Sequence, residues 1–246
     1  MKLLFAAALV LSLIAICTPR ANALASEQTA QQIACNGGHY EYLLYAPDSN
    51  AAPDSATKKT ASAPRAAIMI LHGAGDHAVS FIETWKAFAQ KENVVILAPE
   101  LPRKLEFEAV APAVFRCVVQ HASTLVSLDP RQIYLFGHSM GGYLAYDGAM
   151  FCSDLFAAVA VHAMGIDPEY DGIVKNATRK IPIKIYIGDR DPLVPLTGVR
   201  RTRDMLLHAG FPVEYKELPG HDHNYYLLAD QVNADAWKFF GKHRLG

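Results

Sequence analysis

One stretch decides the fold of this chain of 246 residues: Ile133-Tyr134-Leu135-Phe136-Gly137-His138-Ser139-Met140-Gly141-Gly142. Its first four residues are apolar and predict a buried strand, and residues 140–150 predict a helix. A Gly-x-Ser-x-Gly pattern joins the two, so the chain must turn sharply, with small residues on either side of Ser139. Such a turn lifts the serine hydroxyl above the end of a sheet and places it at a helix N-terminus. Ser139 is therefore the candidate nucleophile.

A serine hydroxyl becomes a good nucleophile only when a base removes its proton, and a carboxylate usually orients that base. Two aspartates follow the expected strand 183–187. We favour Asp191, because an extended Pro-x-Val-Pro segment follows it, whereas Asp189 lies next to the strand end and suits a turn or an ion pair. Asp167, in the loop after the preceding strand, is a more distant alternative.

Two histidines follow the last expected strand, 213–217. We expect His223, at the start of the final helix, to be the base, and His221 to be a hydrogen-bonded loop residue. A His-x-His pattern can also belong to a metal site, but no second cluster of His, Cys or Asp has recognisable ligand spacing. The sequence therefore predicts no metal and no cofactor.

A loop with the sequence His72-Gly73-Ala74-Gly75 follows the expected strand 67–71. Ester hydrolysis passes through an oxyanion that needs two N–H donors. The amides of Ala74 and Met140 are the candidates, since one donor comes from such a loop and the other from the residue after the nucleophile. His72 is expected to be a structural residue beneath the site.

Strands and helices alternate along most of the chain. Asn36-Gly37 predicts a hairpin over 29–45. The later strands are uniform apolar runs, which is typical of a parallel sheet covered on both faces. The predicted fold class is α/β, with a mostly parallel eight-stranded sheet, an N-terminal antiparallel hairpin and helices on both faces. The expected strands are 67–71, 94–98, 133–136, 156–161, 183–187 and 213–217, and the expected helices are 80–91, 105–128, 140–150, 197–208 and 224–240.

Composition limits the function. Hydrophobic residues make up 51% of the chain and charged residues 19%, which excludes a disordered protein. The net charge of −1 offers no basic field for nucleic acid. Only about 20 residues separate the strands that end at 161 and begin at 183, so we expect no large lid. Residues 48–65 read as a surface loop.

The first 25 residues have the pattern of a cleaved signal peptide: Lys2, an apolar run from Leu3 to Cys17, and two small-x-small sites, Ala21-Asn22-Ala23 and Ala23-Leu24-Ala25. The apolar run is shorter than the roughly 20 residues that span a membrane. We therefore expect a secreted or periplasmic protein with no stable membrane insertion, and a single domain over 26–246. The sequence does not predict an oligomeric state.

The order His72-Gly73, Ser139, Asp191 and His223 resembles the α/β-hydrolase superfamily over most of the chain. Segments 70–75, 128–134 and 156–160 are similar to feruloyl esterases and polyhydroxybutyrate depolymerases, and segment 222–226 is similar to the histidine segment of S-formylglutathione hydrolases. The resemblance implies a serine esterase that cleaves small-molecule or polymer-end carboxylic esters through an acyl-enzyme. A peptidase or thioesterase with the same residues, and a non-catalytic binding protein with this fold, are the alternatives.

Three cysteines remain after residue 25, an odd number, so one disulfide and one thiol are the simplest arrangement in an oxidising compartment. In the fold that the resemblance implies, the helices before and after the 133–136 strand pack side by side. These helices carry Cys117 and Cys152. A Cys117–Cys152 bridge, which would leave Cys35 free, is therefore a candidate pairing, but the sequence does not decide the pairing.

Overall fold

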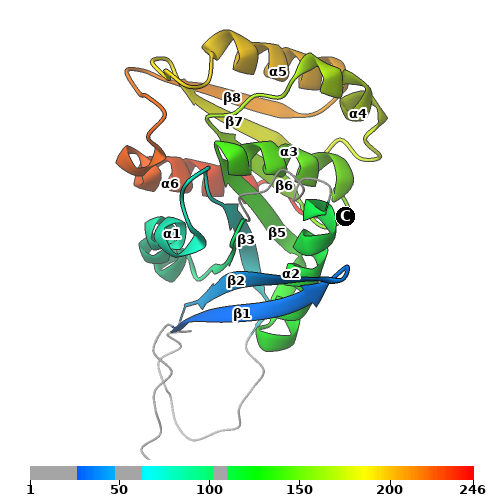
Figure 1. Ribbon diagram of the computed structural model, residues 1–246, viewed down its shortest axis with the longest axis vertical. Helices are drawn as coiled ribbons and strands as arrows, with labels where there is room; N and C mark the ends of the chain where they lie inside the picture. Colours follow the sequence, from blue (N-terminus) through cyan, green and yellow to red (C-terminus); the bar gives the residue numbers. More distant parts are fainter. Residues whose placement is uncertain (1–26, 48–62, 102–109) are drawn as a thin grey trace, which may run out of the picture.

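The computed structural model describes residues 27–47, 63–101 and 110–246. Its centre is an eight-stranded sheet with the strand order β1-β2-β4-β3-β5-β6-β7-β8 (Figure 1). The pairs β1–β2 and β2–β4 are antiparallel, and every other neighbouring pair is parallel. The strands are β1 (Glu27–Cys35), β2 (Gly38–Ala46), β3 (Arg65–Leu71), β4 (Val95–Pro99), β5 (Leu128–His138), β6 (Ala158–His162), β7 (Ile183–Gly188) and β8 (Val213–Leu218). The predicted fold class is confirmed.

The β1–β2 hairpin turns where the sequence predicts. Asn36 and Gly37 have φ angles of 49° and 77°, which is the left-handed region that a tight hairpin turn requires. The turn sets the register, so that Cys35 pairs with Gly38 and Glu27 with Ala46.

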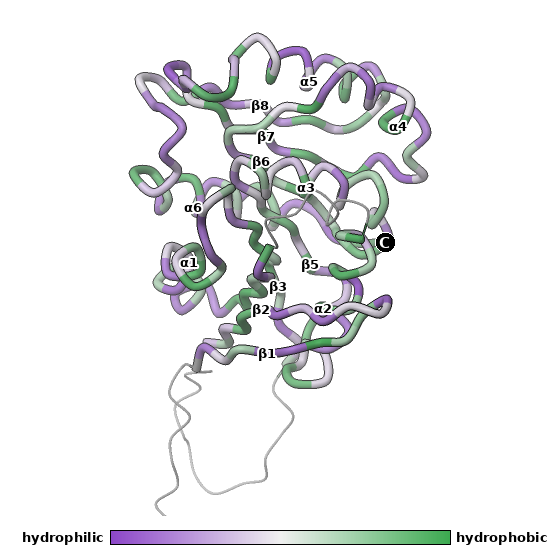
Figure 2. The backbone as a smooth tube through the Cα atoms, viewed as in Figure 1, coloured by the Kyte–Doolittle hydropathy of each residue, from purple (hydrophilic) through white to green (hydrophobic). Residues whose placement is uncertain are grey.

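Helices cover both faces of the sheet. On one face lie α1 (Ala78–Glu92) and α6 (Ala229–Phe240), and on the other lie α2 (Ala111–Leu125), α3 (Met140–Phe151), α4 (Asp171–Asn176) and α5 (Leu196–His208) (Figure 1). Two short 3-10 helices, η2 (Pro168–Tyr170) and η3 (Tyr225–Leu227), complete the described elements. Figure 2 shows hydrophobic residues along the central strands β3 and β5, between the two helical layers. Burial on both sides explains why these strands are uniform apolar runs.

Two of the expected helices have boundaries that differ from the sequence prediction. The expected helix 105–128 is α2, which begins at Ala111; Pro112 therefore lies in its first turn, where a proline breaks no helical hydrogen bond. Residues 102–109 lie outside the described residues. The expected helix 224–240 is divided into η3 and α6, and the side chain of Asn224 caps the start of η3 by accepting the amide of Tyr226. The predicted signal peptide and most of the predicted loop 48–65 also lie outside the described residues.

The candidate Cys117–Cys152 pairing is wrong. Cys117 is bonded to Cys35, across 82 residues of sequence, because α2 packs against β1 and turns that side chain toward the hairpin. Cys152 is a buried thiol whose Sγ lies 3.4 Å from the carbonyl oxygen of Pro112. That contact is at the start of α2, more than one helical turn from Cys117.

The carboxyl ends of the parallel strands β3, β5, β7 and β8 meet at one edge of the sheet. The loops that leave these ends hold the histidine-glycine loop 72–75, Ser139, Asp191 and His223. Between β6 and β7 the described chain holds only η2 and the six-residue helix α4, so no large insertion is present at this point of the described chain.

Candidate active site

Ser139 lies in the sharp turn between β5 and α3. Its φ of 54° and ψ of −121° are unusual for a residue with a side chain, and such strain persists only where the surroundings enforce it. Here the amide of Ser139 donates to the carbonyl of His162 over 2.9 Å, and the carbonyl of Ser139 accepts the amide of Gly142 over 2.7 Å. The backbone is therefore pinned on both sides of the hydroxyl.

The glycines of the motif are required by close backbone contacts. A Cβ added to Gly137 would lie 2.1 Å from the carbonyl oxygen of Gly141, and a Cβ added to Gly141 would lie 2.2 Å from that of Leu71. The turn therefore accepts no side chain at either position, which explains the spacing of the pattern around Ser139.

His223 joins Ser139 to Asp191 in one hydrogen-bonded chain. Its Nδ1 lies 2.8 Å from Asp191 Oδ2, and its Nε2 lies 2.9 Å from Ser139 Oγ. A carboxylate can only accept, so the proton is on Nδ1 and Nε2 accepts from the serine hydroxyl. Nε2 is thus free to take the serine proton.

The carboxylate of Asp191 is fixed and almost fully buried, with its side chain 1% exposed. Its second oxygen, Oδ1, accepts the amides of Leu193 and Val194, each over 2.9 Å. Charge-assisted bonds to two backbone amides compensate for the loss of water around this carboxylate.

The rival residues from the sequence have other contacts. Asp189 Oδ1 accepts the amide of Gly220 over 2.6 Å, which ties the β7 loop to the loop before His223. His221 is buried with its ring 5.4 Å from that of His162. Asp167 is exposed and lines a groove of about 480 Å³ beside the loop that follows Asp191.

The loop from His72 to Gly75 lies directly beside the serine. A Cβ added to Gly73 would lie 3.4 Å from Ser139 Cβ. His72 is buried beneath this loop, as predicted: its Nδ1–H donates to the carbonyl of Gly73 over 2.9 Å, and its Nε2 accepts the amide of Leu101 over 3.1 Å. The position of the loop is therefore set from below.

The two candidate oxyanion donors flank Ser139. Met140 is the first residue of α3, so its amide is one of the four that have no acceptor within the helix. Ala74 is exposed, in the loop next to Ser139. Both backbone segments are therefore placed to offer an N–H at the mouth of the site.

Sequence reasoning missed two groups around the site. Tyr226 is 44% exposed and donates its hydroxyl to the carboxylate of Asp76. This bond links the loop after His223 to the loop after β3. The second group is a set of buried histidines that includes His138 and His162. Both histidines end strands at the site edge of the sheet, and this position is the signal that could have found them.

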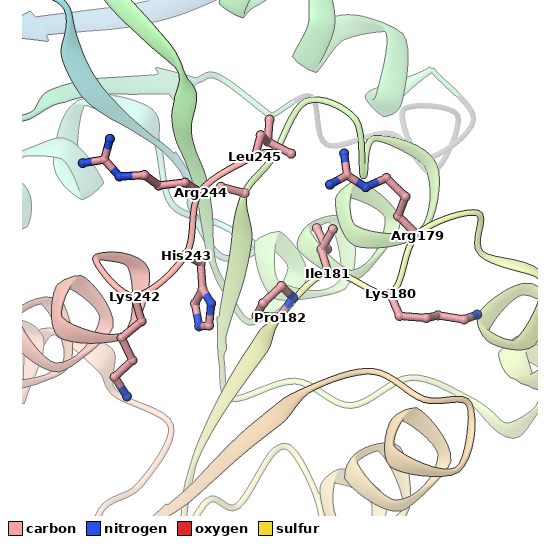
Figure 3. Close-up of a pocket in the computed structure, with 9 residues that line it drawn as sticks. Arg179, Lys180, Ile181, Pro182, Lys242, His243, Arg244 and Leu245 are labelled. Carbon is pink, nitrogen blue, oxygen red and sulfur yellow. The ribbon is translucent and has the colours of Figure 1, made fainter.

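A basic cavity lies at the opposite edge of the sheet and belongs to another part of the molecule. It has a volume of about 470 Å³ and is formed where the chain approaches β7 and where it leaves α6 (Figure 3). Its basic residues make contacts of their own: Lys242 pairs with Glu214 over 2.7 Å, and Arg244 lies 3.8 Å from Asp129. Because it lies before β7 and Asp191 follows β7, it takes no part in the Ser139 site.

The described residues contain neither a cluster of metal-binding side chains nor a helix that could cross a membrane. Residues 27–47, 63–101 and 110–246 contain no group of three or more His, Cys, Asp or Glu side chains that could hold a metal ion. Among the helices of the same segments, none has the length and apolar character needed to cross a membrane.

Comparisons with known proteins agree with the fold. Residues 68–177 match the family model described as Alpha/beta hydrolase family. The chain is 21% identical over 201 residues to the acyl-protein thioesterase 1 of Gibberella zeae. The alignment covers 67% of this chain and 86% of that relative.

Solved structures show the same likeness at low identity. A thermostable esterase is 20% identical to this chain, with a TM-score of 0.67. The superposition covers 89% of this chain, and the chain spans 63% of the length of that esterase. A poly(3-hydroxybutyrate) depolymerase from Bordetella parapertussis has 18% identity and a TM-score of 0.68, covering 86% of this chain and 90% of that one. The chain has the α/β-hydrolase fold, and its predicted resemblance to the esterases of that superfamily is confirmed.

Proposed function

We propose that this protein is a serine hydrolase that cleaves carboxylic esters through an acyl-enzyme intermediate. The observation that carries the proposal is the continuous chain of hydrogen bonds from Asp191 through His223 to Ser139, with Ser139 held at a strained turn. Esterases and a thioesterase among the similar proteins support it.

The reaction begins when Ser139 Oγ attacks the acyl carbonyl and His223 Nε2 takes the hydroxyl proton. Asp191 orients His223 and stabilises its charged form. The amides of Ala74 and Met140 hold the oxyanion, and each such donor contributes about 3 kcal/mol. His223 then gives the proton to the leaving alcohol, and water releases the acid in a second round of the same steps. These residues perform this chemistry without a cofactor.

The substrates are small esters or the exposed ends of larger ones. The part of the chain that the structure describes between β6 and β7 has only η2 and α4, so no large insertion there restricts the access of bulky substrates to Ser139. Beside His223 there is a cavity of about 250 Å³, which suits a small leaving group.

The protein is exported and acts as a single domain over residues 26–246. The signal-peptide pattern of residues 1–25 supports export. The disulfide between Cys35 and Cys117 agrees with an oxidising compartment, in which such bonds persist.

A thioesterase is the second candidate, because the similar curated protein from Gibberella zeae is an acyl-protein thioesterase. Thioesters and oxygen esters share the same acyl-enzyme route. The ratio of kcat/KM for a short p-nitrophenyl ester to that for the matching thiophenyl ester separates the two: a ratio above one favours the esterase.

The test of the main proposal is the hydrolysis of a short p-nitrophenyl ester by Ser139→Ala. Loss of one member of such a triad lowers kcat by about 10³-fold or more. Ser80→Ala, at an exposed serine of α1, is the matched control and keeps the wild-type rate. Hydrolysis by Ser139→Ala at the wild-type rate would overturn the proposal.

A further inference from the structure

Three buried histidines lie behind His223, and the proposed reaction uses none of them. His138, His162 and His221 are 7%, 0% and 6% exposed. Their rings contact in series: the centroid of His138 lies 5.1 Å from that of His223 and 5.1 Å from that of His162, and His162 lies 5.4 Å from His221. The ring of His138 therefore separates His223 from the core.

Hydrogen-bond accounting assigns the protons of the inner pair. The Nδ1 atoms of His138 and His162 are 3.0 Å apart, and one of two neutral imidazoles must donate while the other accepts. Nε2 of His162 is buried and has no hydrogen-bond partner among the described residues. Buried N–H groups without an acceptor are rarer than buried acceptors without a donor. His162 therefore carries its proton on Nδ1 and donates it to His138, whose own proton is on Nε2.

This assignment directs the N–H of His138 toward the site. A Cβ added to Gly73 would lie 3.5 Å from His138 Nε2, so Nε2 lies beside the proposed oxyanion loop. His138 also lines the cavity of about 250 Å³ that His223 and Tyr226 border. The ring thus has one edge bonded to the core and the other at the site.

Burial keeps the inner pair uncharged. Desolvation, followed by the nearby His223, lowers the pKa of His138 to about 4. Desolvation, followed by His138, lowers the pKa of His162 well below its usual value. The backbone of His162 and the carboxylates of Asp191 and Asp76 raise the pKa of His138, but their effects are weaker than the desolvation. A neutral His138 puts no positive charge beside His223 when that ring takes the serine proton.

The two hydrogen bonds of His223, at Nδ1 and Nε2, both depend on one side-chain torsion. The ring turns about its Cβ–Cγ bond, and such a rotation carries both nitrogens away from Asp191 and Ser139. The ring of His138, inclined by 47° to that of His223, packs against it and so opposes this rotation. His138 also stacks on Tyr225 at 5.5 Å and on Phe81 at 6.4 Å.

We propose that His138 and His162 are positioning residues for His223. The Nδ1–H of His162 fixes the ring of His138, and that ring holds the plane of His223 in the orientation that reaches both Ser139 and Asp191. This inference rests on the proposed function, since the reaction is what the orientation serves, but its structural part can be tested without a substrate.

The first test is the tautomeric state of the histidines, measured by ¹⁵N NMR on the wild-type protein at pH 7.5. The inference expects His162 protonated on Nδ1 and His138 protonated on Nε2. Assignment of the reverse tautomers, or of a charged His138 at this pH, would overturn it. Because this measurement needs no variant and no activity, it stands even if the esterase proposal fails.

The second test compares His162→Phe with His162→Asn. The phenyl ring fills the space but cannot donate, whereas the Asn amide can replace the Nδ1–H. We expect His162→Phe to lower kcat about tenfold with KM changed less than about twofold, because a small misplacement of a catalytic group acts on the chemical step. The downfield proton signal of the His223–Asp191 bond should weaken in parallel, and His162→Asn should restore both.

The control is His39→Gln, at an exposed histidine of the hairpin, which leaves both readouts at their wild-type values. A folded His162→Phe variant with wild-type kcat and an unchanged downfield signal contradicts the inference. If the wild type hydrolyses no ester, the proposed function fails, and the downfield signal in His162→Phe still decides the positioning role.

Discussion

His223 donates its Nδ1–H to Asp191 Oδ2 over 2.8 Å, while Asp191 Oδ1 accepts the amides of Leu193 and Val194. The carboxylate therefore has one oxygen anchored to the backbone and one directed at the imidazole. This division makes Asp191, rather than Asp189, the residue that sets the tautomer of His223.

The first prediction concerns the two aspartates. Asp191→Asn should lower kcat by about 10⁴-fold, because an amide that donates to Nδ1 forces the proton of His223 onto Nε2. Asp189→Asn is the matched control: its side-chain oxygen still accepts the amide of Gly220, so kcat should stay within about threefold of wild type. Steady-state hydrolysis of one p-nitrophenyl ester by both variants is the measurement. Equal losses in the two variants would contradict the assignment.

The sequence predicted much of this fold, because its signals were local. The hairpin turn at Asn36-Gly37 and the glycines around Ser139 are required by backbone geometry alone, and the structure has them where expected. The disulfide was not predictable in the same way. Which face of α2 carries Cys117 relative to β1 depends on packing between segments 82 residues apart.

The site was predictable in part for the same reason. Ser139, Asp191 and His223 each follow an expected strand and have the roles of nucleophile, acid and base, so they were expected together, and the structure brings them within hydrogen-bonding distance. The bond between Tyr226 and Asp76 joins residues 150 positions apart. No local sequence pattern predicts a contact between two residues so far apart in the chain.

The second prediction concerns stability against acid. The pKa of His138 is about 4 in the folded protein, against 6.5 for the free side chain. The unfolded chain therefore binds more protons between these values, so this residue stabilises the fold above pH 6.5 and loses that contribution as the pH falls toward 4. The loss amounts to about 3 kcal/mol for His138.

Urea unfolding at several pH values between 8 and 4 measures this effect. Carboxylates also contribute to acid unfolding, so the comparison is with His138→Phe, which cannot be protonated. The free energy of unfolding of His138→Phe should fall less steeply below pH 6.5 than that of wild type. Parallel curves would show that His138 does not titrate as stated.

The third prediction concerns the cysteines. Without reductant, the unfolded protein should show one reactive thiol among Cys35, Cys117 and Cys152, and the folded protein none, because burial raises the pKa of Cys152 to about 11. Thiol titration with and without denaturant is the measurement, and protein expressed without residues 1–25 excludes Cys17 from the count. Two or three reactive thiols in the unfolded, non-reduced protein would contradict the Cys35–Cys117 pairing.

Removal of this disulfide should cost stability. Cys35→Ser together with Cys117→Ser should lower the free energy of unfolding by about 4 kcal/mol, as expected for a bond that closes a loop of 82 residues. The matched variant Cys152→Ser should leave the disulfide in place. If the double variant is as stable as wild type in urea, the bond does not constrain the unfolded chain as argued.

The fourth prediction concerns Tyr226 and Asp76. Tyr226→Phe removes only the hydroxyl that reaches Asp76, and so frees the loop that carries Ala74. Since one such bond contributes about 1 kcal/mol, kcat should fall about fivefold while the thermal midpoint changes little. Asp76→Asn retains an acceptor and should lose less. A wild-type kcat in Tyr226→Phe would show that the contact does not support the oxyanion loop.

The central claim is that Ser139 is an activated nucleophile, and covalent labelling tests it most directly. A fluorophosphonate probe added to the purified protein, followed by mass spectrometry of the peptides, should place one phosphonate group on Ser139. His223→Ala should label at least about 10³-fold more slowly, because the base that activates the hydroxyl is gone. Absence of labelling at Ser139, or equal labelling rates in wild type and His223→Ala, would contradict the account.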